Sequence, residues 1–381
     1  MLTLLTSPRR HIMEEALQNA RQIIDETDRL MASLFEKRMN AVRLVAEYKK
    51  SHGLLITDPV RETEMLARNA EYISDPSLRE DYKRFLSDTM KTSRNYQRRF
   101  LEGMTVAYAG TEGAFAHIAA NKLYPTARKK SYGDFAGAYN AVVSGECDVC
   151  VLPLENSSAG EVGQVTDLLF GGPLYINGTY ELSVTHDLVG VHGTKEDDIK
   201  TVVSHPQALM QCDSYIREHN LDKQSASNTA LAAKYVAEKG DKTVAAIASG
   251  ETAKLYGLKV IRDSINTSDS NTTRFAVLSL NDNKGAASAH GTSFALMFTV
   301  KNEAGALAQA LNIIGYHGYN LRTLRSRPRK DLLWRYCFYA EAEGDIYGDN
   351  GTNLIEELGV CCDRIKILGE FKKLSPAEDS E

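Results

Sequence analysis

The N-terminal part of the chain carries apolar residues at the spacing of α-helices. Between Glu14 and Tyr48 they recur every three or four positions, on one face of a helix: Ile24, Leu30, Met31, Leu34, Phe35, Val42 and Leu44. Ser51–Gly53 is typical of a helix stop, Asp58–Pro59 of a second helix start, and Asp75–Ser77 of a third helix that runs to about Leu101. Three helices with one long member make a poor core for one chain, so we predict pairing with a second copy.

From Met104 onward, short apolar strands alternate with helices. Strands are expected at Thr105–Tyr108, Val149–Leu154, Thr201–Val203, Val244–Ala248 and Phe275–Leu280. Helices are expected at Phe115–Leu123, at about Val162–Leu169 and after Ser204–Pro206. This alternation predicts an α/β domain whose sheet has a parallel part.

A stretch rich in Gly, Ala and Ser, Lys284–Gly291, precedes the last segment. Its expected elements are, in order, a strand at Phe294–Val300, a helix from Gly305 to about Tyr316, strands at Asn320–Ser326 and Leu333–Ala342, a helix near Leu354 and a strand at Ile365–Leu368. The order strand–helix–strand–strand–helix–strand predicts a small α+β, ferredoxin-like unit.

Length and composition agree with a multidomain globular protein. The 381 residues exceed one ordinary hydrophobic core, and we predict three domains, at residues 9–101, 103–282 and 292–375. Apolar residues make up 43% of the chain and charged residues 25%, as in soluble proteins. The chain has no apolar run long enough for a bilayer, and Met1–Met13 lacks the regions of a secretory signal, so we expect a cytoplasmic protein.

Charge and cysteine content narrow the classes of function. The net charge of −5 disfavours nucleic acid as the main partner, but a small anionic substrate responds to local arginines instead. Six cysteines in a long chain without a signal do not indicate a disulfide framework. Cys147 and Cys150 have the spacing of a metal or redox pair, but they lead into a buried strand and no second pair completes a zinc site. We interpret them, and Cys361–Cys362, as packing residues, and expect no metal or organic cofactor.

The helical segment holds charged and polar residues within otherwise apolar faces. In chain order they are Arg21, Arg38, Lys49, Asp58, Arg61, Glu62, Ser93 and Gln97. Each alone is an ordinary solvated side chain of a long helix. As a set, they resemble the bacterial, all-helical type of chorismate mutase at every one of these positions.

This resemblance implies an intertwined dimer that rearranges chorismate to prephenate. The reaction needs a dicarboxylate held in its reactive conformation and donors aimed at the ether oxygen, without a nucleophile or proton transfer. By resemblance, Arg38 and Arg21 hold carboxylates, with Arg21 reaching in from the partner chain. Lys49 and Gln97 face the ether oxygen. The remaining positions address the hydroxyl side or complete the pocket: Asp58, Glu62, Arg61 and Ser93.

Polar loops follow several strands of the α/β segment. Gly110–Gly113, Glu155–Ser158 and Ser204–Gln207 are each expected to open a helix after a strand. Helix N-termini bind carboxylates, and loops after parallel strands are where such sheets hold ligands. Together the loops predict a small anion bound between two lobes.

Asp269–Leu280 is the most informative stretch, a polar run that leads into an apolar strand. Turn chemistry predicts a turn at Thr273–Phe275 that enters a buried strand. Thr273–Phe275 also resembles the Thr-Arg-Phe motif of prephenate dehydratases. Three further motifs occur in the order found in that family: Gly110–His117, Leu152–Gly160 and Ser204–Gln211. One position departs from the pattern, because Ala116 stands where Ser or Thr is common.

The dehydratase resemblance implies two lobes of the periplasmic-binding-protein type with the site in their cleft. By motif, the active-site residues are Asn156, Ser157, Ser204, Gln211 and Thr273, and Arg274 pairs with a substrate carboxylate. Threonine does not titrate usefully, so we interpret Thr273 as a positioned hydrogen-bond donor or relay to the leaving hydroxyl. Glu155 and His205 are candidate proton sources, with a local bond at the helix start as the alternative for His205.

The last segment resembles the ACT regulatory domains that bind phenylalanine. Two motifs and one further position carry the resemblance: Gly305, Ala306 and Leu307; Ser326, Arg327 and Pro328; and Asn320. Ala304 replaces the usual Pro, and Arg325 replaces the usual Glu, which inverts a charge. The resemblance implies feedback inhibition by phenylalanine, and a dimerising unit without a ligand is the alternative.

Together the three segments resemble the bifunctional chorismate mutase/prephenate dehydratases of L-phenylalanine biosynthesis. A non-catalytic amino-acid sensor and a mutase with an inactive dehydratase domain remain alternatives. The complete mutase set argues against a sensor, which has no use for Lys49 and Gln97 aimed inward. The expected partners are chorismate, prephenate, phenylalanine and further copies of the chain, as a homodimer or higher homo-oligomer.

Overall fold

The computed structural model describes residues 8–52, 54, 56–57, 59–267, 271–282, 284, 292–301, 303–328 and 336–377, with side chains from residue 14 onward. It divides into two compact units, Met1–Gly103 and Met104–Glu381. Across the described residues, no helix is both long and apolar enough to cross a membrane.

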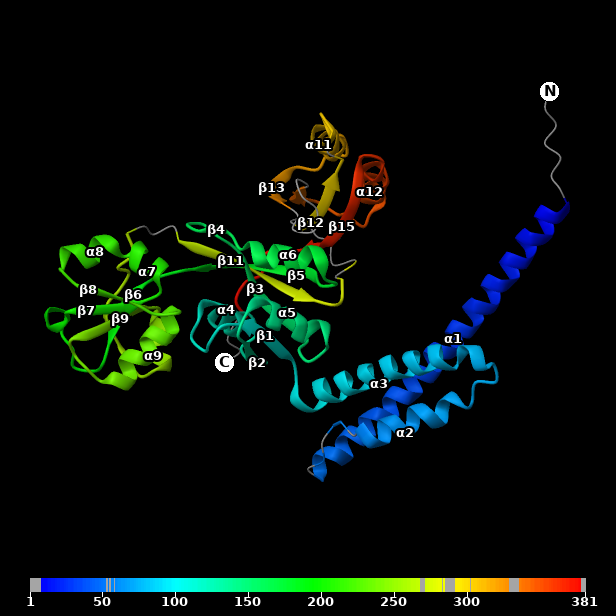
Figure 1. Cartoon of the computed structure of the whole chain (residues 1–381), viewed down its shortest axis with the longest axis horizontal. Coiled ribbons are helices and arrows are strands. Elements are labelled where there is room, and N and C mark those ends of the chain that lie inside the picture. The colour runs from blue at the N-terminus through cyan, green and yellow to red at the C-terminus, as the bar shows by residue number, and fades with distance from the viewer. Residues whose placement is uncertain are drawn as a thin grey trace. The chain divides into compact units, whose positions relative to one another are not determined.

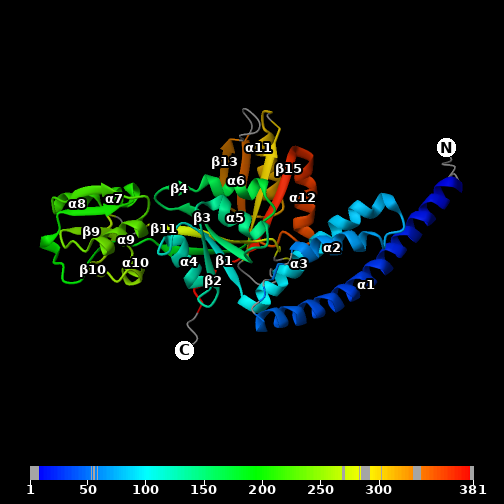
Figure 2. The ribbon, with the colours of Figure 1, turned by 60° about the horizontal axis from the view of Figure 1, so that its bottom comes forward.

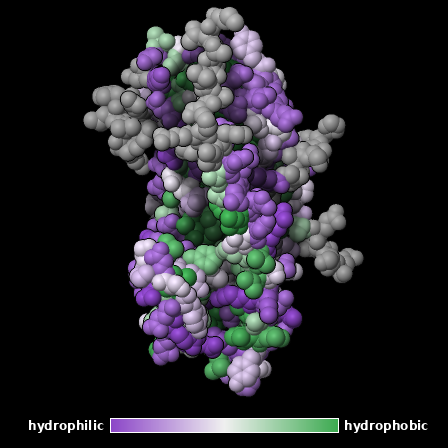
Figure 3. Space-filling model, turned by 90° about the vertical axis from the view of Figure 1, so that its right-hand side faces the viewer, coloured by the Kyte–Doolittle hydropathy of each residue, from purple (hydrophilic) through white to green (hydrophobic). Residues whose placement is uncertain are grey.

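The first unit consists of helices (Figure 1). They are α1 (Pro8–Ser51), α2 (Pro59–Ala70), the short 3-10 helix η1 (Pro76–Leu78) and α3 (Arg79–Glu102). The expected cap at Asp75 is present, because its Oδ1 accepts a hydrogen bond of 2.9 Å from the backbone N of Ser77. Leu86 and Met90 of α3 are buried. Many apolar side chains of α1 are exposed, among them Leu17, Ile23, Ile24, Leu30, Leu34 and Leu44; exposed apolar side chains are green in Figure 3.

The second unit begins with a lobe built on a mixed sheet, the first lobe. Its strand order is β2 (Arg128–Tyr132), β1 (Thr105–Ala109), β3 (Val149–Asn156), β11 (Thr272–Ser279) and β5 (Tyr175–Ser183), with β4 (Gly160–Glu161) paired to β3. β1 runs parallel to β2 and β3, whereas β11 is antiparallel to both of its neighbours. Its helices are α4 (Phe115–Leu123), α5 (Phe135–Val143) and α6 (Gly163–Gly171).

A second lobe is inserted between β5 and β11. Its strand order is β10 (Lys259–Arg262), β6 (Asp187–Gly190), β9 (Val244–Ala248), β7 (Thr201–Ser204) and β8 (Asp222–Ser225). The helices are α7 (Pro206–Gln211), α8 (Asp213–Glu218), α9 (Thr229–Lys239) and α10 (Gly250–Leu255), with the 3-10 helix η2 (Glu196–Asp198). The chain therefore crosses between the lobes twice, before β6 and before β11 (Figure 2).

Two local expectations are wrong. Thr273–Phe275 is not a turn, because β11 begins at Thr272 and Thr273 pairs with Asn156 on one side and Leu182 on the other. Glu155–Ser158 does not open a helix, because β3 continues through Asn156 and the chain turns back as β4 before α6. In both cases pairing with neighbouring strands overrides the local turn preference of Asn, Ser and Thr.

The third sheet has the expected order of strands and helices. It contains β12 (Ser293–Val300), α11 (Ala306–Tyr316), β13 (Leu321–Pro328), β14 (Tyr336–Glu343), α12 (Asp349–Cys361) and β15 (Cys362–Phe371). The strands are antiparallel, in the order β13-β14-β12-β15.

Both faces of the third sheet are covered. Phe294, Leu296 and Phe298 of β12 pack with residues of α11 and α12. The alternate residues, Ala295 and Met297, join the core that fills one side of the first sheet, as do Leu368 and Phe371 of β15. The third sheet and the first lobe therefore share one hydrophobic core.

The end of β15 lies against β5. The backbone N of Thr179 donates to the carbonyl of Lys372 at 3.0 Å, and the carbonyl of Thr179 accepts from the backbone N of Leu374 at 2.7 Å. Gly369 makes this approach possible: its φ is +125°, and a Cβ there would lie 2.5 Å from the carbonyl oxygen of Ile176.

We expect Gly369→Ala to lower the free energy of unfolding by about 2 kcal/mol or more, because it combines a disfavoured φ with a backbone clash. Urea unfolding of the full chain measures this change. Gly359→Ala is the matched control: Gly359 lies in α12 with no described atom within 4 Å of its Cβ position, and Ala there should add about 0.5–1 kcal/mol. Equal effects of the two substitutions would contradict the proposed packing constraint.

Candidate functional site

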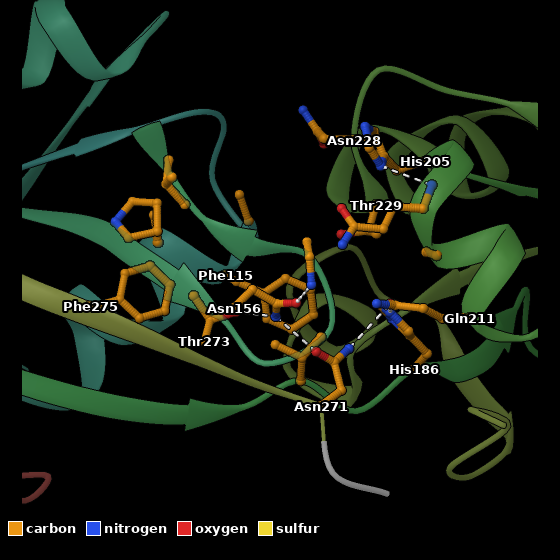
Figure 4. Close-up of a pocket in the computed structure, with 18 of the residues that line it drawn as sticks. Phe115, Asn156, His186, His205, Gln211, Asn228, Thr229, Asn271, Thr273 and Phe275 are labelled. Carbon is orange, nitrogen blue, oxygen red and sulfur yellow. Dashed lines mark hydrogen bonds between the residues drawn. The ribbon is translucent and has the colours of Figure 1, made fainter. Parts of the chain in front are cut away.

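A cavity of about 320 Å³ opens between the two lobes of the second unit (Figure 4). The first lobe contributes Phe115, Asn156, Thr273 and Phe275 to its wall, and the second lobe contributes His205, Gln211, Asn228 and Thr229. His186 and Asn271 come from the two crossings between the lobes. Among the described lining residues there is no Lys or Arg. The donors that face the cavity are therefore amides, hydroxyls, imidazoles and the starts of α4 and α9.

A chain of side-chain amides runs along one wall of this cavity (Figure 4). Asn156 Nδ2 donates to Thr273 Oγ1 at 2.9 Å and to Asn271 Oδ1 at 2.8 Å. Asn271 Nδ2 donates to Gln211 Oε1 at 3.2 Å, and His186 Nε2 lies 2.8 Å from the same oxygen. Thr273, Asn156 and Gln211, which the motifs single out, are thus joined through Asn271, and His186 caps the end of the chain; the motifs include neither Asn271 nor His186.

The neighbours of Asn156 and Thr273 point to the other side of the first sheet. Arg274 contacts Glu155 at 3.3 Å and Glu341 of β14 at 2.8 Å, and Arg325 of β13 pairs with the same Glu155. Tyr339 also donates to Glu341. Burial by itself lowers the pKa of Arg274, but the Glu341 carboxylate outweighs burial and holds this pKa above its usual value. Arg274 therefore faces the third sheet and does not line the cavity.

The hydroxyls of two predicted active-site serines form hydrogen bonds with backbone groups. The Ser204 hydroxyl is fully buried and donates to the carbonyl of Ile247 at 2.6 Å, across β7 and β9. Ser157 Oγ accepts from the backbone N of Thr272 at 2.9 Å. Neither residue lines the cavity.

The two candidate proton sources also differ in position. His205 lines the cavity at the start of α7, where its Nδ1 accepts from the backbone N of Gln207 at 3.2 Å, which is the local bond considered as its alternative. Glu155 is held on the opposite face by Arg274 and Arg325.

The motif analysis missed His186 and Asn271. Asn271 lies two residues before Thr273, so strand alternation alone would have placed both on one face. His186 lies at the crossing before β6, where the sequence has neither a motif nor a periodic pattern that singles it out.

The helical unit holds a second cavity, of about 220 Å³. It brings together six predicted mutase residues: Arg38, Lys49, Arg61, Glu62, Ser93 and Gln97. Arg38 donates to Ser93, and Lys49 Nζ donates to the carbonyl of Ile56 at 2.6 Å. Burial lowers the pKa of Arg38. Gln97 Oε1 is buried without a hydrogen-bond partner among the described residues, so it can accept from a ligand.

Arg94 also lines this cavity, whereas the predicted residues Arg21 and Asp58 are not among its described lining residues. Arg94, which the sequence analysis missed, lines it and pairs with Glu62 at 2.6 Å; it lies one turn before Gln97 on α3, a spacing that could have revealed it. Arg21 is exposed and lies outside the cavity, about 25 Å before Arg38 along α1 at the rise of a helix. Asp58 lies outside the described residues.

The predicted regulatory positions lie at the ends of α11 and β13. Gly305 precedes α11 with φ +82°, Ala306 is buried and Leu307 is half-buried. Asn320, Ser326 and Pro328 are exposed. Arg327 is engaged by Asp167 of α6 through two hydrogen bonds, one of 2.9 Å from Nη2. In the part of the chain that the structure describes, no cluster of three or more His, Cys, Asp or Glu side chains could hold a metal ion.

Comparison with known proteins agrees with this division. Residues 20–98 match the family model of type II chorismate mutase, and residues 106–283 match that of prephenate dehydratase. A bifunctional chorismate mutase/prephenate dehydratase of Neisseria gonorrhoeae is 31% identical over 362 residues, which cover 94% of this chain and 98% of the relative. The chain belongs to this bifunctional family. It rearranges chorismate to prephenate and converts prephenate to phenylpyruvate.

Two solved structures resemble the second unit of this mutase–dehydratase. A prephenate dehydratase from Arthrobacter aurescens, in complex with L-Phe, has a TM-score of 0.65 at 25% identity and covers 72% of this chain and 92% of its own. A protein described as a novel type of quorum-quenching acylase has a TM-score of 0.66 at 30% identity and covers 71% of this chain and 98% of its own. The two-lobed arrangement is therefore shared with at least one named dehydratase.

Proposed function

We propose that the cavity between the two lobes is the dehydratase site and that the cavity of the helical unit is the mutase site. The observation that carries the first assignment is the amide chain that ends on the Thr273 hydroxyl. The second assignment rests on the six clustered mutase residues. We also infer domain boundaries near residues 9–101, 103–282 and 292–375.

In the dehydratase site, Thr273 assists departure of the ring hydroxyl of prephenate. The bond between the ring and its carboxylate breaks and releases carbon dioxide, and the electrons of that bond complete the aromatic ring as the hydroxyl leaves. The hydroxyl takes up one proton from solvent and departs as water. Thr273 Oγ1 accepts from Asn156 Nδ2, so its own hydrogen is free to point at the leaving oxygen. A donor placed in advance at developing negative charge lowers the barrier without later reorganisation.

The substrate carboxylates meet helix starts and amides in this cavity. Ala114–Ala116 at the start of α4 and Asn228–Thr229 at the start of α9 line it, and helix N-termini favour anions. Gln211 supplies an amide on the same wall. Arg274 is withdrawn from this role by its ion pairs with Glu155 and Glu341, and we assign it to holding β11 against the third sheet.

Replacement of Thr273 by Val keeps its shape but removes the hydroxyl. We expect dehydratase kcat to fall about a hundredfold to a thousandfold, the loss typical of one donor to developing charge, with mutase activity unchanged. Phenylpyruvate absorbance measures the effect. Thr273→Ser should retain most of the activity, and Thr272→Val is the control on the neighbouring position, which does not line the cavity. Wild-type dehydratase rates for Thr273→Val would rule out this role.

In the mutase site, Lys49 stabilises charge on the ether oxygen of chorismate. We expect Lys49→Ala to reduce mutase turnover about a hundredfold or more while prephenate consumption persists. Lys50→Ala, an exposed neighbour on the same helix, is the control and should leave both activities unchanged. Chorismate disappearance, followed by its absorbance, distinguishes the variants.

The mutase site is completed by a second chain. The exposed apolar residues of α1 and the distance of Arg21 from its own cavity both support an intertwined homodimer, or a higher homo-oligomer built from it. Co-refolding Arg21→Ala chains with inactive Lys49→Ala chains tests this arrangement, because a mixed dimer contains one site with both residues intact. Mutase activity no higher than that of the separate variants would contradict a shared site.

The third sheet is an ACT-type regulatory domain with a ferredoxin-like arrangement. Its strand order supports this assignment, and so does the A. aurescens relative solved in complex with L-Phe. Two arginines of β13 contact acids of the first lobe, Arg325 at Glu155 and Arg327 at Asp167. A ligand that binds near Ser326–Pro328 would therefore act on a strand that is already tied to the neighbour of Asn156.

Calorimetric titration of the full chain with phenylalanine, with tyrosine as the comparison ligand, tests the regulatory role. We expect phenylalanine to bind with release of heat and to lower dehydratase activity at the same concentrations, since binding and inhibition are linked. The absence of binding by either amino acid would leave only a structural role for the third sheet.

A coupled assay separates the proposed function from its two alternatives. Chorismate as the only substrate should yield phenylpyruvate. A sensor without catalysis would consume no chorismate, and a mutase with an inactive dehydratase domain would stop at prephenate.

A further inference from the structure

His186 lies at one end of the amide chain and Asn156 lies near the other. The orientation of the Asn156 amide determines whether His186 donates or accepts a hydrogen bond. Asn156 Oδ1 accepts from the backbone N of Ser158 at 3.0 Å and of Ala159 at 2.9 Å. A backbone N–H can only donate, so the orientation of the Asn156 amide is fixed. Its Nδ2 must face Thr273 Oγ1 and Asn271 Oδ1, as observed.

The fixed end determines each later contact. Asn271 presents its oxygen to Asn156, so its Nδ2 faces Gln211 and donates to Gln211 Oε1. Gln211 thus presents an oxygen to His186 Nε2, 2.8 Å away. An oxygen without hydrogens can only accept, so Nε2 must carry the hydrogen.

The surroundings of His186 favour this neutral form. The residue is 2% exposed, and its Nδ1 is buried without a hydrogen-bond partner among the described residues. A second proton on Nδ1 would therefore meet no acceptor. The Phe115 ring packs edge-on against the imidazole, with 6.0 Å between ring centroids. Burial lowers the pKa of His186, and Gln211 and the neighbouring Asp187 carboxylate oppose this shift only in part.

We propose that His186 is a positioning residue of the dehydratase site, a permanent Nε2–H donor that, together with Asn271, holds Gln211 Oε1 and so keeps the Gln211 amide in its donating orientation. With Oε1 occupied by His186 and Asn271, the Gln211 amide hydrogens are left to donate to substrate. The inference rests on the proposed location of the dehydratase site. His186 itself neither gives nor takes a proton in the reaction.

Three substitutions separate a positioning donor from an acid or base. His186→Gln places an amide N–H near the position of Nε2 and should keep dehydratase kcat within about threefold of wild type. His186→Leu removes the donor and should lower kcat about tenfold to a hundredfold, the range of one buried hydrogen bond left unmade. His186→Glu sets an acceptor against Gln211 Oε1 and should lower kcat at least as far. His192→Gln and His192→Leu, at an exposed histidine of the same lobe, are the matched controls and should have no effect.

The pH profile decides the role. A positioning donor predicts that His186→Gln and wild type share the same dependence of kcat on pH. Loss of an ionisation from the profile of His186→Gln, or a fall in kcat as large as that of His186→Leu, would overturn the proposal. Urea unfolding of each variant reports whether the second unit has folded, since mutase activity reports only on the helical unit.

Nitrogen NMR of the unmodified protein tests the tautomer without any loss of folding. In chains labelled with 15N-histidine, the His186 signals are assigned by their absence from His186→Gln. We expect the neutral Nε2–H tautomer from about pH 6 to pH 8, below and above the ordinary histidine pKa. An Nδ1–H tautomer, or protonation within this range, would refute the inference. Normal dehydratase activity of Thr273→Val, by contrast, would refute the location of the site.

Discussion

The pairing of β3 with β11 is the constraint on which the proposed dehydratase site depends. Adjacent residues of β11 face opposite sides of the first sheet, and a register shift that leaves Leu154 of β3 unpaired brings Asn156 opposite Thr273 and Glu155 opposite Arg274. Asn156 and Thr273 therefore reach the cavity, while Glu155 and Arg274 reach the third sheet. The side chains of Arg274 and Glu341 are only 18% and 4% exposed. Removing one partner of such a pair leaves a buried charge uncompensated, which is far more costly than losing a surface ion pair. The charged face therefore holds the backbone that positions Asn156 and Thr273 in the cavity wall.

Much of this architecture could be predicted from the sequence because the elements have strong local signals. The helix caps, the apolar strands and the order of the third sheet all follow from periodicity and turn residues. Thr273, Asn156 and Gln211 could be found because family motifs contain them, and they meet at one cavity. These residues lie in one wall of the cavity because β3 pairs with β11 and because the second lobe packs beside them. The sequence of one segment alone does not show which strands pair.

The differences between the motif residues and the cavity wall arise from strand geometry and from contacts between distant segments. Arg274 looks like a carboxylate ligand in the motif, but it lies between Thr273 and Phe275 on β11, which both line the cavity, so its side chain faces the third sheet. Ser204 lies in a recognised motif, yet its hydroxyl is used within the second sheet. His186 carries no local signal, because its importance arises only when Gln211 and Asn271 are brought beside it.

The core shared by the third sheet and the first lobe limits how such a chain can change over evolution. A C-terminal sheet borrowed from another protein would need apolar residues in place of Met297, Leu368 and Phe371 to cover the first sheet. It would also need cations in place of Arg325 and Arg327 to balance Glu155 and Asp167. A simple exchange of modules would expose apolar surface and leave the half-buried carboxylates of Glu155 and Asp167 without their cations. The two parts are therefore expected to be inherited together and to vary in concert, so that an inverted charge such as Arg325 is tolerated only where its partner suits it.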